Sequence, residues 1–242
     1  MTKNPTHKYK PHRPIALPDR TWPNNTISKT PTWCSVDLRD GNQALVTPMS
    51  LQQKLRLFDL LVDLGFKEIE VGFPSAAQVE LDFLRTLIDT NRIPKGVVVQ
   101  VLTQAREHLI EATCQALEGC DQAILHIYNS TSILQRDIVF KKDKQAIMDI
   151  AIQGIKWTKK YVEKYGLSDK ITLEYSPESF TGTEIDYAID VCNAVIKEWG
   201  GTKPIIINLP ATVELFTPNV YADMIEWSHR NLIERDRVIL SL

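Results

Sequence analysis

Residues 33–43 read WCSVDLRDGNQ, and the interpretation of the whole chain starts from this stretch. The short apolar run over residues 33–36 predicts a buried β-strand. One cation and two carboxylates (Arg39, Asp37 and Asp40) follow at once, where a glycine allows the backbone to turn. Taken alone, this charge cluster is equally compatible with a solvated turn that contains an Arg–Asp pair. The remainder of the chain decides between the two interpretations.

The composition is that of an ordinary globular protein. The chain has 242 residues, of which 43% are hydrophobic and 24% are charged, and this length fits one α/β barrel. Its net charge of −2 gives no basic surface for nucleic acid or a membrane surface, and no apolar run approaches the ~20 residues of a membrane span. The first residues contain no apolar segment typical of a secretory leader, and the four cysteines form no CxxC pair. We therefore expect a cytoplasmic protein with reduced, buried thiols.

Strand-like and helix-like segments alternate along the chain. Ser50 and Gln53 form a capping box at the start of the first predicted helix, and Thr183 is predicted to cap a later one. Strands followed by helices predict parallel βα units, as in a doubly wound sheet or a (β/α)₈ barrel. No G-x-G-x-x-G motif follows the first strand, which weakens the dinucleotide-binding alternative. The predicted strands are residues 33–36, 68–73, 96–102, 122–127, 171–175, 204–209 and 237–242.

Polar side chains gather at the carboxyl ends of the predicted strands, whereas the helix-to-strand connections carry simple surface charges. Barrel enzymes build their active sites from the loops at the C-terminal face, so this asymmetry favours a TIM (β/α)₈ barrel. Each residue also has a simpler explanation; His126, for example, is compatible with a buried histidine bonded to backbone. The strand-end residues are Arg39, Asp40, Pro74, Ser75, Thr103, Gln104, His126, Tyr128, Asn129, Ser176, Glu178, Asn208 and Thr212.

Six sequence blocks, in order, resemble the 2-isopropylmalate synthases, and most closely their long form. The resemblance extends from about residue 10 to residue 242. The RDG segment alone indicates only the wider family of barrel metalloenzymes, which includes homocitrate synthase. The six blocks are DRTWPN (19–24), SVDLRDGNQ (35–43), EVGFPSA (70–76), YNSTS (128–132), YSPESFTGTE (175–184) and NLPATVE (208–214).

The resemblance implies a Claisen-type condensation of acetyl-CoA with 2-oxoisovalerate, which gives 2-isopropylmalate and CoA in the first step of leucine biosynthesis. It also implies a divalent metal (Mg²⁺, Mn²⁺ or Zn²⁺) with Asp40 as a carboxylate ligand, a donor that suits these ions. Arg39 and Glu178 match residues at the reacting centre, where Glu178 is either base or positioner. The residues that match keto-acid contacts are Arg39, His126, Ser176, Asn208, Pro210 and Thr212.

Two regions are predicted. Residues 1–31 are polar and rich in proline, and we expect an N-terminal arm that either lies over a neighbouring subunit or is disordered. Residues 32–242 are predicted to form the catalytic barrel, truncated before the end of strand seven, with about seven of the eight strands. The family completes its metal site with an H-x-H motif, and none of the five histidines here forms such a pair. We therefore expect an N-terminal portion of a longer, homodimeric enzyme, with little or no synthase activity on its own.

Two alternatives remain open. A homologous acyltransferase, such as homocitrate or citramalate synthase, would differ in the 2-oxo acid that it accepts. A non-catalytic truncated subunit would bind the intact enzyme without turning over substrate. The sequence does not distinguish among the candidate metals.

Overall fold

The computed structural model describes residue 4 and residues 15–242. Seven strands form one parallel sheet, and each strand pairs with the next one in chain order. The strands are β1 (Cys34–Ser35), β2 (Glu68–Gly72), β3 (Val98–Gln104), β4 (Ala123–Ser130), β5 (Ile171–Glu178), β6 (Ile205–Asn208) and β7 (Val238–Ser241). The α-helices between them are α1 (Leu51–Asp63), α2 (Gln78–Asp89), α3 (Glu107–Ala116), α4 (Lys144–Lys164), α5 (Ile185–Trp199) and α6 (Pro218–Asn231).

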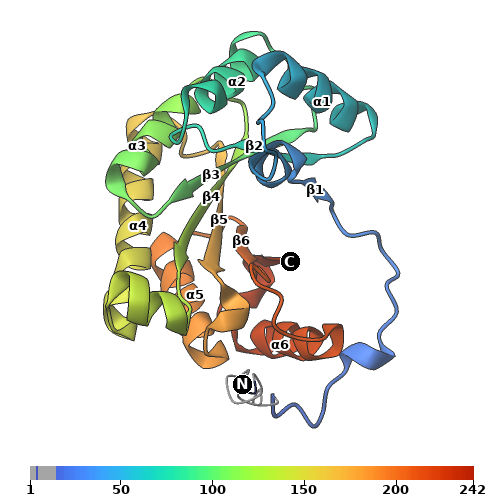
Figure 1. Cartoon of the computed structure of the whole chain (residues 1–242), viewed down its shortest axis with the longest axis vertical. Helices are drawn as coiled ribbons and strands as arrows, with labels where there is room; N and C mark the ends of the chain where they lie inside the picture. Colours follow the sequence, from blue (N-terminus) through green and yellow to red (C-terminus); the bar gives the residue numbers. More distant parts are fainter. Residues whose placement is uncertain (1–3, 5–14) are drawn as a thin grey trace.

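The sheet is curled, and the helices form an arc around its outer side (Figure 1). Because the strands pair in chain order, right-handed crossovers place every connecting helix on the same face of the sheet. The predicted (β/α) barrel architecture with seven of eight strands is confirmed.

The two faces of the sheet differ in chemistry because successive side chains of a strand point in opposite directions. In β3, Val99 and Val101 belong to the hydrophobic core, and the intervening Gln100 is buried among polar side chains. In β4, His126 likewise lies between the core residues Leu125 and Ile127. The outer face therefore supplies the core under the helices, and the inner face carries a buried polar layer.

Most predicted elements occur close to their expected positions, and three differences are informative. The first strand is only two residues long because the chain enters a π-helical turn at Asp37–Gly41. Strands β4 and β5 continue beyond the predicted ends, because their polar residues pair in register as far as Ser130 and Glu178. The capping box of α1 is present, but the prediction for Thr183 is wrong: its hydroxyl donates to the Ser179 carbonyl.

Residues 19–22 of the predicted arm lie against α6 of the same chain, and the segment that follows leads away from α6 to β1 (Figure 1). Arg20 makes two hydrogen bonds to Asp223, and the Trp22 indole donates to the same carboxylate at 2.7 Å. The backbone amides of Thr21 and Trp22 donate to Glu226. Residues 1–3 and 5–14 of the predicted arm lie outside the described residues. Residues 19–22 are therefore fastened to a helix that lies about 200 positions further along the chain.

All four cysteines are free, and three of them are buried. Within the part of the chain that the structure describes, no helix has both the length and the apolar character that crossing a membrane requires.

The double substitution Asp223→Asn and Glu226→Gln should release the arm from α6. Both side chains are mostly buried under residues 19–22, with exposed fractions of 14% and 11%. Trypsin should then cleave after Arg20 several-fold faster, because loosened segments are cut preferentially. Mass spectrometry of timed digests measures the rate, and Asp169→Asn, which removes an exposed ion pair with Lys203, is the control. Equal cleavage rates in all three proteins would contradict the assignment.

Candidate active site

The turn after β1 sets the direction of Arg39. The Val36 carbonyl accepts hydrogen bonds from the amides of Arg39, Asp40 and Gly41, at 3.2, 2.8 and 3.2 Å. The side chain of Leu38 is fully buried and anchors the turn to the core. Arg39 consequently points over the interior of the curled sheet and not into solvent, with 18% of its side chain exposed.

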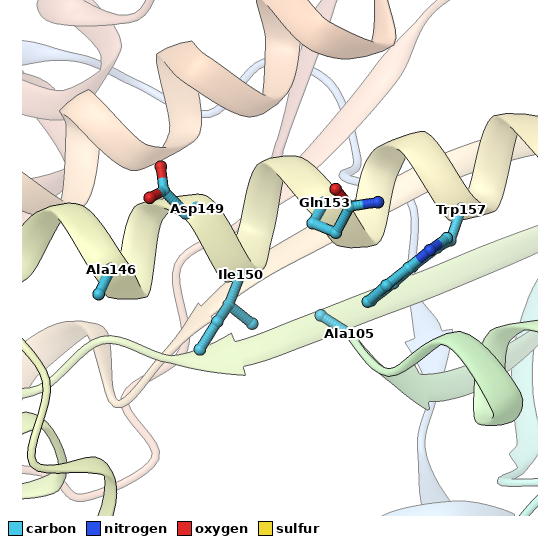
Figure 2. A pocket seen from close by; sticks show the side chains of 6 residues that line it. All are labelled: Ala105, Ala146, Asp149, Ile150, Gln153 and Trp157. Atoms are coloured by element: carbon cyan, nitrogen blue, oxygen red, sulfur yellow. The ribbon is translucent and has the colours of Figure 1, made fainter.

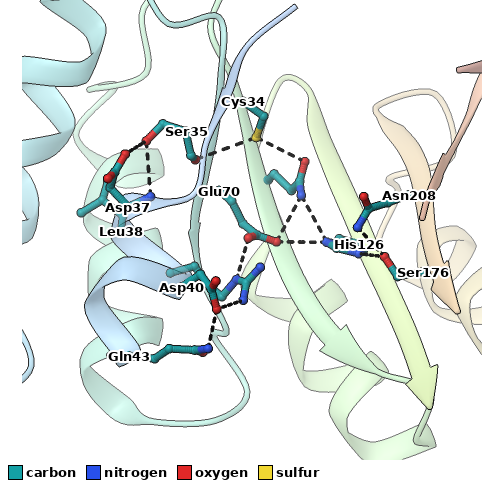
Figure 3. A network of polar contacts seen from close by, with 12 residues as sticks. Cys34, Ser35, Asp37, Leu38, Asp40, Gln43, Glu70, His126, Ser176 and Asn208 are labelled. Carbon is teal, nitrogen blue, oxygen red and sulfur yellow. Dashed lines mark hydrogen bonds and ion pairs between the residues drawn. The ribbon is translucent and has the colours of Figure 1, made fainter. Parts of the chain in front are cut away.

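Glu70 on β2 is the centre of a buried polar network (Figure 3). One carboxylate oxygen accepts from Arg39 Nε at 2.6 Å. The other contacts His126 Nδ1 at 3.0 Å and Gln100 Nε2 at 3.1 Å. Burial favours the neutral acid, but the hydrogen bond and charge of His126 and the charge of Arg39 outweigh it and lower the pKa of Glu70 to about 2.

His126 continues the network across β4 and β5. Burial alone would lower the pKa of His126, but the carboxylates of Glu174 and Glu70 together raise it above its ordinary value. Its Nε2 lies 2.6 Å from the hydroxyl oxygen of Ser176, which also accepts from Asn208 Nδ2 at 2.8 Å. A continuous chain of contacts therefore runs from the turn after β1 to the end of β6.

The protonation state of His126 determines what Ser176 can donate. An ionised Glu70 only accepts hydrogen bonds, so His126 Nδ1 carries a proton. When Nε2 is also protonated, His126 and Asn208 both donate to Ser176, and the serine proton is available to a ligand. When Nε2 is unprotonated, it accepts the serine proton itself. A protonated His126 thus makes Ser176 a hydrogen-bond donor for an anion.

Three further predicted residues lie at the same end of the sheet. Glu178, the last residue of β5, accepts a hydrogen bond from the Ser130 hydroxyl. Thr212 Oγ1 accepts from the Ser179 amide at 3.1 Å, and Pro210 is half-buried on the loop after β6. Among the described residues, no hydrogen bond or ion pair joins Glu178 or Thr212 to Arg39 or His126. The structure therefore brings Arg39, Asp40, His126, Ser176 and Asn208 into one connected set, and leaves Glu178, Pro210 and Thr212 beside it.

The sequence-based prediction missed Glu70, Gln100 and Glu174 as parts of this network. Each has an apolar residue on either side of it in its strand, and all three are buried. A polar side chain between two core residues of a buried strand requires a partner, because an unpaired buried polar group or charge is costly. That signal could have identified them.

Asp40 alone does not make a metal site. Its carboxylate is 53% exposed, and one of its oxygens accepts from Arg39 and from Gln43. In the described part of the chain, no group of three or more His, Cys, Asp or Glu side chains could hold a metal ion. The described residues therefore offer a single carboxylate ligand and do not by themselves fit a complete divalent metal centre.

Two pockets lie away from the network. One, of about 330 Å³, is lined by Ala105 after β3 and by α4 residues that include Trp157, and Asp149 is its one titratable side chain (Figure 2). The other, of about 490 Å³, lies between the arm, α6 and β7 and includes Trp22 and His229. Neither pocket includes a member of the network.

The chain is similar to curated 2-isopropylmalate synthases over nearly all its length. The protein of Parafrankia sp. (strain EAN1pec) is 58% identical over 240 residues, which cover 98% of this chain and 42% of the relative. The protein of Rhodospirillum rubrum is 57% identical over 244 residues, which cover 100% of this chain and 44% of the relative. The resemblance inferred from the six blocks is confirmed. The chain spans about two fifths of the length of these relatives.

Solved structures with a similar fold include two HMG-CoA lyases. The enzyme of Bacillus subtilis matches with a TM-score of 0.60 at 15% identity, over 84% of this chain and 65% of the other. The enzyme of Brucella melitensis matches with a TM-score of 0.59 at 18% identity, over 86% and 70%. At such low identity these matches support the fold alone. A model of the HMGL-like family matches residues 30–242, and the chain therefore belongs to the HMGL-like family.

Proposed function

We propose that this chain provides keto-acid-binding and catalytic residues of a 2-isopropylmalate synthase. This acyltransferase condenses acetyl-CoA with 2-oxoisovalerate and releases 2-isopropylmalate and CoA. The observation that carries the proposal is the connected set Arg39–Glu70–His126–Ser176–Asn208, which presents a cation and several hydrogen-bond donors at the carboxyl ends of the strands. Similarity to curated synthases supports the choice of reaction.

The polarity of the connected set fits a 2-oxo acid, which carries a carboxylate and an adjacent ketone oxygen. Arg39 supplies the positive charge, and its location at the carboxyl ends of the strands suits the stabilisation of a developing oxyanion. Ser176 and Asn208 supply neutral donors, with His126 controlling the serine proton. Pro210 and Thr212 on the loop after β6 complete the proposed contacts to the keto acid.

The reaction requires three events. A base removes a proton from the acetyl methyl group, and the resulting carbanion attacks the ketone carbon of 2-oxoisovalerate. The ketone oxygen becomes an alkoxide, which Arg39 stabilises before it is protonated. Water then hydrolyses the thioester, so that acetyl-CoA, keto acid and water yield 2-isopropylmalate and CoA. Glu178, at the end of β5, is proposed as the base or as a positioning carboxylate.

Further parts of the proposal concern the whole enzyme. A divalent ion (Mg²⁺, Mn²⁺ or Zn²⁺) would polarise the ketone, and Asp40 would be one of its ligands. The enzyme is proposed to be a cytoplasmic homodimer that binds neither nucleic acid nor membranes. The alternative activities, homocitrate and citramalate synthase, share this chemistry and differ in the keto acid.

CoA release by the full-length protein tests the proposed reaction. With acetyl-CoA present, release should be fastest with 2-oxoisovalerate and much slower with 2-oxoglutarate or pyruvate. Arg39→Gln should lower kcat/KM by about 10²-fold or more, because it removes the charge that faces the alkoxide. Arg92→Gln, which removes an exposed ion pair with Asp59, should retain the wild-type rate. Preference for another keto acid, or an active Arg39→Gln variant that is folded by circular dichroism, would refute the assignment.

Glu70→Gln tests the coupling between Glu70 and His126. The substitution should destabilise the chain by about 1.5–3 kcal/mol near neutral pH, because it removes the charged acceptor that Arg39 and His126 share and leaves them Asp40 and the more distant Glu174. In ¹⁵N NMR the pKa of His126 should fall, since Glu70 raises it.

The shifted pKa values of Glu70 and His126 make the free energy of unfolding depend on pH. Folding lowers the pKa of Glu70 from 4.5 to about 2. The ionised carboxylate therefore stabilises the folded chain above pH 4.5, and this stabilisation is lost as the pH falls from 4.5 to about 2. His126 has a raised pKa when folded, so its contribution is lost as the pH rises through that value. In urea titrations the difference between wild type and Glu70→Gln should therefore shrink below pH 4.5. Glu111→Gln, on an exposed ion pair, is the control, and a constant difference would contradict the coupling.

A further inference from the structure

Lys54 is a wholly buried lysine on α1, outside the connected set described above. Its ammonium lies 2.6 Å from a carboxylate oxygen of Glu80 on α2 and donates to the Leu38 carbonyl at 3.2 Å. It also lies 5.2 Å from the centre of the Phe83 ring, within the range of a cation–π contact. A buried ammonium requires such partners, and this one has an anion, a carbonyl and an aromatic ring.

The carbonyl that Lys54 contacts belongs to the turn that carries the site. Leu38 directly precedes Arg39, and its side chain is fully buried. The ammonium of Lys54 therefore fixes the peptide group from which Arg39 extends. A shift of this carbonyl would change the direction of both Arg39 and Asp40.

The carboxylate of Glu80 contacts a second backbone segment of the site. A Cβ atom built on Gly72 would lie only 2.0 Å from Glu80 Oε2, so the carboxylate is packed directly against the glycine. Gly72 lies two residues after Glu70, where the register between β2 and β3 shifts. Glu80 thus touches the backbone from which Glu70 extends.

We propose that the Lys54–Glu80 ion pair positions Arg39 against Glu70, with Lys54 as the positioning residue for the turn and Glu80 for the strand. Arg39 Nε and Glu70 Oε2 meet at 2.6 Å, and this contact requires both backbone segments to be placed correctly. The consequence for keto-acid binding rests on the proposed function, whereas the positioning of Arg39 does not. Neither Lys54 nor Glu80 belongs to the proposed ligand contacts.

In the alternative to this proposal, the Lys54–Glu80 ion pair has a purely structural role and only joins α1 to α2. The chain offers a matched comparison, because Asp59 on α1 also pairs with Arg92, just after α2, at 2.9 Å. That pair is largely exposed and touches neither Leu38 nor Gly72. Removing it tests the link between the helices without disturbing the turn.

The test measures the hydrogen exchange of the Arg39 side chain and the ligand affinity of the 242-residue chain. The ¹⁵N-detected Arg39 Nε–H signal, assigned by its loss in Arg39→Lys, reports exchange with water, and calorimetry with 2-oxoisovalerate reports affinity. In the double variant Lys54→Met with Glu80→Gln, exchange should become about tenfold faster and binding about tenfold weaker. Lys54→Arg, which keeps the charge, should stay within about threefold of wild type. Arg92→Gln should change neither value by more than about twofold.

Each outcome decides the proposal. A folded double variant with wild-type exchange and affinity would overturn it, as would an equal effect of Arg92→Gln. If the double variant loses its circular dichroism spectrum, Glu80→Gln alone is measured, since it keeps the side-chain volume, and unchanged Arg39 exchange there overturns the proposal. If wild type does not bind 2-oxoisovalerate, the proposed function fails, and the exchange rates still decide the role of the ion pair.

Discussion

A guanidinium and a carboxylate meet inside the curled sheet, where Arg39 Nε lies 2.6 Å from Glu70. Glu70 is fully buried and needs opposite charge, because an unpaired ion in a low-dielectric interior costs several kcal/mol, and Arg39 supplies the nearest one. The remaining polar side chains of the interior are arranged around this contact. His126 and Gln100 satisfy the second oxygen of Glu70. The pair therefore determines both the charge and the geometry of the candidate site.

The parallel sheet makes this arrangement possible. In parallel strands the carboxyl ends all lie on one side, so residues far apart in the chain converge without long loops. Tyr128 pairs with Ser176 and Ser130 with Glu178 in a register that continues to the strand ends. The outward-facing valines, leucines and isoleucines of the same strands build the core. The strands that carry the inner polar layer are therefore held in place by the hydrophobic core between the sheet and the helices.

Two ion pairs, each with one fully buried member, lie close to the turn after β1. Arg39 and Glu70 face the interior, and Lys54 and Glu80 lie behind them among α1, α2 and the turn. Leu38 and Gly72 are the backbone points where the second pair touches the segments that carry the first. Burying the charges of Glu70 and Lys54 is unfavourable for stability alone, which is consistent with a role in setting geometry. The glycine at position 72 permits the closest of these approaches.

Local sequence was sufficient for most of the helices and strands and for the polar residues at the carboxyl ends of the strands. A sequence displays directly the features that depend on residues a few positions apart in the chain. These features include apolar periodicity, the Ser50–Gln53 capping box and the polar residues at strand ends. Pairing across strands is different, because it depends on register and on the curl of the sheet. The tertiary structure alone decided that Glu70 joins Arg39 to His126, that Lys54 reaches the Leu38 carbonyl, and that residues 19–22 bind α6. A charge inside an apolar strand signals in the sequence that a partner exists, but only the folded chain can show which residue it is.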